Sequence, residues 1–236
     1  MQSPEVSPQH PWMRAFLLAL VAFLVSAGYL WLRRWGAPLD TVLYKISFAG
    51  LATAGTFLLA YSYGIGPFAR FFPRLFVSEL SMRKYYGLLG YFLIVVHVVW
   101  ALATFGPKRY PRLFVEGEFT TITIVSLILG VTAFALFSIV AFTSMQRIAT
   151  NMSTDAWKTT QRVGYLGLLV ALVHFTVLKY KGWLAIATWP SLPVDYFSFL
   201  SFVSLPPLSL LLFVFIVGVF LLRGLAIVCP GQLPGK

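Results

Sequence analysis

Charged residues and cysteine are both scarce in this sequence. Only 11% of the 236 residues are charged, whereas 59% are hydrophobic and the mean hydropathy is +0.83. An ordinary soluble domain carries roughly a quarter charged residues, so this composition excludes one. The single cysteine, Cys229, excludes an internal disulfide framework, a paired-cysteine redox motif, a covalently attached c-type haem and a cysteine-bound iron–sulfur cluster.

Acidic residues are the rarest charges, with 7 Asp and Glu against 18 Lys and Arg. The charges lie mostly between apolar stretches, where they suit lipid headgroups, so we expect membrane lipid as a partner and no nucleic acid. No carboxylate lies deep inside an apolar stretch, which makes a proton-coupled transporter the weaker hypothesis. The motifs of metalloproteases, P-loop proteins and serine hydrolases are missing as well, so the sequence has no complete catalytic site of its own.

Six apolar stretches are each long enough to cross a bilayer, whose hydrocarbon core of ~30 Å takes about 20 helical residues. They lie at residues 14–32, 41–63, 82–105, 119–142, 157–178 and 207–228. The first stretch is longer than the apolar part of a signal peptide, so we expect an uncleaved helix. The sequence therefore predicts an all-α integral membrane protein, with a single transmembrane domain over residues 1–236 that forms a six-helix bundle.

The connections and the charges suggest how the bundle sits in the membrane. Residues 66–81 and 179–206 mix aromatic, proline and basic residues, and we expect them to lie at the membrane surface. Ten of the 18 Lys and Arg fall on the side of the two termini, and the other eight fall on the opposite side. By the positive-inside rule, this narrow difference predicts a multi-pass protein with both termini in the cytoplasm.

Two of the three histidines lie inside predicted helices, His97 in the third and His174 in the fifth. These helices cross the membrane in the same direction, and at 1.5 Å per residue the histidines lie ~22 and ~24 Å along them. We therefore predict that both reach one depth, in the half of the bilayer away from the termini. His10 lies in an N-terminal coil, and we expect no functional role for it.

A pair of intramembrane histidines at one depth suggests a cofactor. A single one is explained at least as well by a hydrogen bond between helices. Two together favour function, because neutral imidazole is an axial ligand of haem iron. We predict a b-type haem between the third and fifth helices, bound by His97 and His174.

Glycines and basic residues extend this candidate site. Gly90 and Gly167 each precede a histidine by seven residues, which places them within ~20° of the histidine face. We predict that they leave room for a flat macrocycle, the alternative being that they let helices pack closely. The third helix is followed by basic residues that are candidates for pairing with haem propionates or for anchoring to headgroups. These residues are Lys108, Arg109 and Arg112.

On these residues the sequence resembles the ferric reductase-like transmembrane family, most closely its bacterial MsrQ/YedZ branch of haem-binding membrane subunits. The resemblance covers roughly residues 41–183. It is carried by the segment RKYYGLLG at 83–90 with the later His97, and by AFTSMQRIATNMSTDAWKTTQRVGYLGLLVALVHF at 141–175. The family pattern in that second segment is a Thr-Ser near the end of the fourth helix, a Trp that opens the fifth, and histidines farther along.

The resemblance implies that His97 and His174 bind the haem on the side away from the cytoplasm of a bacterial inner membrane. The family usually has another histidine 13 positions before the second one, and this sequence has Gln161 there. Glutamine is not a normal haem ligand, so we expect one haem rather than a two-haem path across the membrane. The sequence also lacks the flavin and nicotinamide domain of the eukaryotic members, so electrons would come from a separate protein, a flavin or a quinol at a partner interface.

The sequence thus predicts a b-type haem-binding subunit that transfers electrons within a membrane redox complex. The alternative is a structural or assembly subunit of a larger membrane complex, in which the haem is vestigial or absent.

Overall fold

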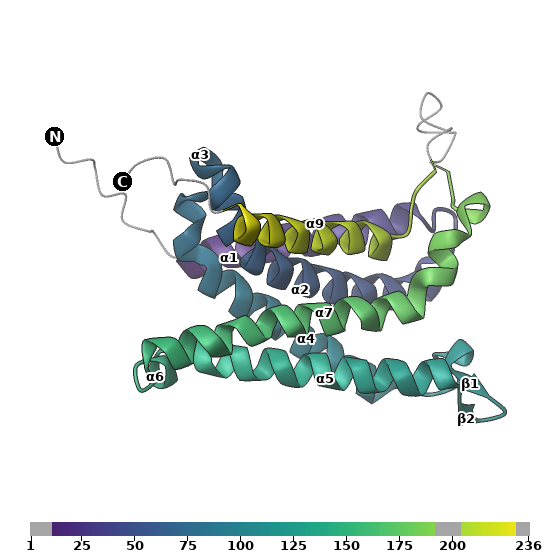
Figure 1. The fold of residues 1–236 in the computed structure, drawn as a ribbon. Coiled ribbons are helices and arrows are strands. Elements are labelled where there is room, and N and C mark those ends of the chain that lie inside the picture. The colour runs from purple at the N-terminus through teal and green to yellow at the C-terminus, as the bar shows by residue number, and fades with distance from the viewer. Residues whose placement is uncertain (1–10, 192–203, 230–236) are drawn as a thin grey trace.

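The computed structural model describes residues 11–191 and 204–229, which form a bundle of long helices (Figure 1). Six of the described helices are long and apolar enough to cross a membrane, which confirms the predicted number and class. They are α1 (Pro11–Leu32), α2 (Leu39–Phe71), α4 (Arg83–Thr104), α5 (Thr121–Ser144), α7 (Thr154–Leu184) and α9 (Leu208–Val228). The connections hold α3 (Pro73–Phe76), η1 (Ser78–Met82), η2 (Pro111–Leu113), β1 (Phe114–Val115), β2 (Glu118–Phe119), α6 (Gln146–Ala149) and η3 (Ile186–Thr188).

Two helices continue past their predicted ends, so part of each connection that we expected at the membrane surface is helical. α2 runs on to Phe71 through Pro67, and α7 runs on to Leu184. A proline removes the N–H that would bond to the carbonyl four residues earlier, here that of Tyr63. The hydroxyl of Tyr165 donates to this carbonyl instead, at 3.1 Å, which satisfies the acceptor and lets α2 continue. Residues 192–203 of the second connection lie outside the described residues.

The helices associate as two close pairs. α2 packs along α4, and α5 packs along α7, whereas the contacts between the two pairs are sparser. α1 and α9 pack against α2, on the far side of the bundle from α5 (Figure 1). In the described part of the chain, α4 and α7 make little direct contact with each other. The two helices that carry the histidines therefore belong to different pairs.

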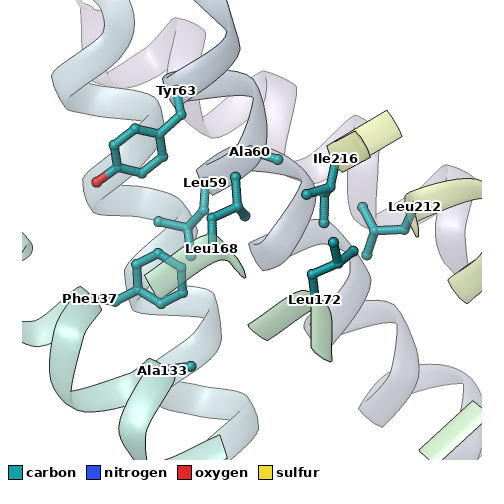
Figure 2. Close-up of a cluster of buried hydrophobic side chains, with 9 residues drawn as sticks. All are labelled: Leu59, Ala60, Tyr63, Ala133, Phe137, Leu168, Leu172, Leu212 and Ile216. Atoms are coloured by element: carbon teal, nitrogen blue, oxygen red, sulfur yellow. The ribbon is translucent and has the colours of Figure 1, made fainter. Parts of the chain in front are cut away.

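One buried cluster joins the two pairs near the middle of the bundle. Figure 2 shows its side chains pointing toward one another from α2, α5, α7 and α9. The cluster consists of Leu59, Ala60, Tyr63, Ala133, Phe137, Leu168, Leu172, Leu212 and Ile216. Burying a large apolar side chain contributes about 1.5–3 kcal/mol in water, but in lipid the gain comes mainly from close packing, so the fit between these side chains is what matters.

A small hairpin, β1–β2, lies in the connection between α4 and α5. Its turn residues Glu116 and Gly117 have φ angles of 54° and 88°. Positive φ at both central positions is typical of a two-residue hairpin turn, but it costs a residue with a Cβ about 1–2 kcal/mol.

Glu116→Asn is expected to stabilise the hairpin by about 0.5–1 kcal/mol, because asparagine tolerates positive φ better than glutamate. The measurement is amide hydrogen exchange at Thr120, whose N–H donates to the carbonyl of Leu113 at 3.1 Å and should exchange more slowly. Glu118→Asn is the matched control, because Glu118 lies in β2 without a positive φ. Equal exchange rates in the two variants would contradict the turn argument.

Candidate functional site

The two intramembrane histidines lie in the interior, toward the end of the bundle away from the termini. His97 is seven residues before the end of α4 at Thr104, which corresponds to about 10 Å. His174 on α7 is half-buried like His97. The two residues that the sequence predicts at one depth therefore both lie inside the bundle, on α4 and α7.

α5 holds the ring of His174. The Nδ1 atom lies 2.8 Å from the backbone carbonyl oxygen of Ser126 and 3.3 Å from its hydroxyl. A carbonyl only accepts, so the shorter bond places the proton on Nδ1 and leaves Nε2 with a free lone pair. Metal-binding histidines commonly donate their other ring N–H to a backbone carbonyl in this way.

His97 has a less complete environment. Its ring lies against the ring of Phe48 on α2, with a centroid distance of 4.3 Å. The Nδ1 atom is buried and has no hydrogen-bond partner among the described residues. A buried polar atom without a partner costs about 1–3 kcal/mol, so this imidazole has bonding capacity that the protein itself does not use.

Two imidazoles fit a haem better than a bare metal ion. A metal that is held by side chains alone usually takes three or more protein ligands, and within the described residues no such group of His, Cys, Asp or Glu occurs. Haem iron takes four ligands from the macrocycle and needs only two from the protein. The donor set of His97 and His174 matches that requirement.

The glycines do not border an open slot. A Cβ at Gly90 would lie 2.9 Å from the Gly55 carbonyl oxygen and from the Leu59 nitrogen, both in the α2 backbone. A Cβ at Gly167 would lie 3.2 Å from the ring of Phe137 on α5. Both glycines thus face a neighbouring helix in a close contact. These contacts favour the helix-packing alternative over the expectation that the glycines make room for a macrocycle.

The ring of Phe48, which lies against His97, packs in turn against the rings of Tyr44 and Tyr110. Arg109 lies over the ring of Tyr44, at 4.9 Å from its centroid. The Tyr44 hydroxyl is within hydrogen-bonding distance of the hydroxyls of Thr104, at 2.7 Å, and Tyr110, at 2.9 Å. Burial and the bond to Tyr44 raise the pKa of Tyr110 to about 12, so this hydroxyl is neutral at physiological pH.

Other basic side chains gather at the same end. Lys108 and Arg112 are exposed in the connection after α4. Lys179 lies five residues after His174 in α7, and Arg34 follows the end of α1 at Leu32. Burial lowers the pKa of Arg34, and the charge of the adjacent Arg33 lowers it further. The end of the bundle nearest the histidines is therefore rich in positive charge.

The opposite half of the interior is filled by side chains. Gln161, which stands where the resemblance would place a histidine, donates to the hydroxyl of Ser144 on α5 at 3.0 Å. Tyr63, Phe137 and Leu168 occupy the space between the helices at the neighbouring level (Figure 2). The hydroxyl of Tyr63 also contacts the backbone at Gly164, where any Cβ would clash with it.

The sequence did not single out Ser126, Gly130, Phe48 or Lys179. A serine and a glycine four residues apart are too common in membrane helices to mark a site. Their role depends on α5 packing along α7, which no local pattern reveals. Lys179 was assigned to a surface connection, because the predicted fifth helix ended one residue before it.

Comparison with known proteins adds no assignment: no protein-family model matches the chain, and no curated protein matches it significantly.

Proposed function

We propose that this chain is a membrane subunit that binds one b-type haem and transfers electrons within a membrane redox complex. The observation that carries the proposal is the pair of half-buried imidazoles on α4 and α7, two helices that belong to different helix pairs. When bound, the haem supplies one-electron chemistry by cycling between ferric and ferrous iron.

The roles of the two histidines follow from their surroundings. His174 would bind through Nε2, since its Nδ1 donates to the carbonyl of Ser126. His97 would hold the group from α4, and its Nδ1 atom has no hydrogen-bond partner among the described residues. With two histidines to hold it, the haem would supply electron transfer rather than oxygen chemistry or substrate binding.

The basic residues support a haem position near the two histidines. Haem carries two propionates, which are stabilised by arginine and lysine. Arg109 and Arg112, with Arg34 and Lys179, are at the end of the bundle nearest the histidines. Lys108 is exposed in the same connection and is equally suited to a lipid headgroup.

The filled opposite half supports a single haem rather than two. Gln161 is bonded to α5, and Tyr63, Phe137 and Leu168 occupy the adjacent interior. Electrons would be exchanged with a separate partner, which is a protein, a flavin or a quinol. We place the chain in a bacterial inner membrane, with both termini in the cytoplasm.

The test is a reduced-minus-oxidised absorption spectrum of the protein purified in detergent, with haem quantified as its pyridine complex. We expect a low-spin b-type spectrum and about one haem per chain, because only one pair of intramembrane histidines is available. A colourless protein after expression with ample haem would overturn the proposal and favour the structural or assembly subunit. Two haems per chain would overturn the single-haem part and require a ligand other than histidine.

A further inference from the structure

Side chains of one helix bond to backbone carbonyls of another at several points in the described bundle. A helix carbonyl already accepts from the N–H four residues later, but its second lone pair can take another donor. The four shortest cases have the acceptors Arg83, Ser126, Tyr63 and Ser62 and the donors Ser62, His174, Tyr165 and Arg83, at 2.7, 2.8, 3.1 and 3.1 Å. A longer contact of 3.5 Å joins Gln161 to Val140 near the end of α5.

These four short bonds share a sequence feature. The residues four positions after the acceptors are Gly87, Gly130, Pro67 and Gly66. Every Cα–Cβ bond in a helix tilts toward the N-terminus, so the side chain at this position covers the turn that holds the acceptor. Glycine leaves the carbonyl uncovered, whereas proline withdraws the N–H that would compete for it.

The fit at Gly130 is especially close. A Cβ built there would lie 3.0 Å from Cε1 of His174 and 3.2 Å from Nδ1. An alanine at this position would therefore shift the imidazole by a few tenths of an ångström and disturb its bond to the Ser126 carbonyl.

We infer that Ser126 and Gly130 form a seat on α5 that holds His174 in the tautomer with its proton on Nδ1 and presents Nε2 to the interior. Gly130 is thus a positioning residue for the candidate ligand. The existence of the seat is independent of the proposed function. Its effect on a haem rests on that function.

The seat has a chemical consequence for a bound metal. A neutral imidazole carries one proton, so only the tautomer with Nδ1–H leaves Nε2 free to coordinate. The bond from Nδ1–H to a carbonyl also raises the basicity of Nε2, which stabilises ferric relative to ferrous iron and lowers the reduction potential. If the Ser126 hydroxyl donated to Nδ1 instead, Nε2 would carry the proton and could not bind iron.

The experiment on the haem-loaded protein compares three alanine variants. For Gly130→Ala we expect a low-spin haem whose midpoint potential rises, by about 59 mV if the equilibrium constant for reduction increases tenfold. Gly218→Ala is the matched control, since a Cβ at Gly218 in α9 would meet nothing within 4 Å. Ser126→Ala keeps the backbone carbonyl and should leave the potential near that of the original protein. The seat is overturned if Gly130→Ala leaves the potential unchanged, or if Ser126→Ala reproduces its shift.

A second measurement needs no haem. Nitrogen-15 NMR of the haem-free protein, labelled at its three histidines, reports which ring nitrogen of His174 carries the proton. We expect Nδ1–H in the original protein and in Gly218→Ala. Nε2–H in the original protein would overturn the seat, even if Gly130→Ala fails to fold. If the original protein binds no haem but shows Nδ1–H, the proposed function fails while the seat stands.

Discussion

Replacing either His97 or His174 by alanine is expected to remove the low-spin haem spectrum entirely while the chain still inserts into the membrane. Each change removes one of the two axial donors, and among the described residues no other histidine can replace it. The free energy of unfolding should change little, although the haem is lost. Neither ring is fully buried, and His97 leaves one nitrogen unpaired.

The controls separate ligation from folding. His10→Ala removes the third histidine, which lies outside the described residues, and should keep the full haem content. Size-exclusion profile and helical circular dichroism should match the original protein in all three variants. An unchanged low-spin spectrum in His97→Ala or His174→Ala would exclude that residue as a ligand. Loss of the folded peak in both histidine variants would instead assign them a structural role.

The helices could be predicted because their physical requirement is local. A bilayer demands a run of apolar residues, and α1, α5 and α9 match their predicted ranges to within a few residues. α2 did not, because Gly64, Gly66 and Pro67 are ordinary signals for the end of a helix. The bond that lets α2 continue comes from Tyr165, about a hundred residues later. Sequence spacing does not reveal such a partner.

The same limit applies to the candidate site. A rise of 1.5 Å per residue predicts His97 and His174 at one depth, and helical periodicity predicts Gly90 and Gly167 on the histidine faces. A face is only a direction, and its neighbour depends on the whole bundle. α2 lies against Gly90 and α5 against Gly167, whereas the glycine that contacts a histidine ring is Gly130.

Because Gly90, Gly167 and Gly218 have different neighbours, we expect their alanine variants to lose different amounts of stability. Gly90→Ala should lose the most. Its Cβ would meet two backbone atoms of α2 at 2.9 Å, and backbone atoms cannot rotate away, so α2 and α4 must separate. Overpacking of this kind typically costs 1–3 kcal/mol, and we expect about that loss here. At Gly167 the Cβ would meet side-chain atoms at 3.2–3.3 Å, which can yield, so the loss should be smaller.

Gly218→Ala sets the baseline of this series. Its Cβ enters open space, and alanine favours a helix over glycine by up to about 1 kcal/mol in water, so the variant should be neutral or slightly more stable. The measurement is the free energy of unfolding in mixed micelles with increasing SDS, together with haem per folded chain. If the glycines serve helix packing, Gly90→Ala should unfold most easily, while the chains that remain folded keep their haem. The contrary outcome is that Gly90→Ala and Gly167→Ala lose haem but are as stable as Gly218→Ala. This outcome would support the slot interpretation. The added methyl group would then displace a macrocycle beside these positions without weakening the contacts between helices.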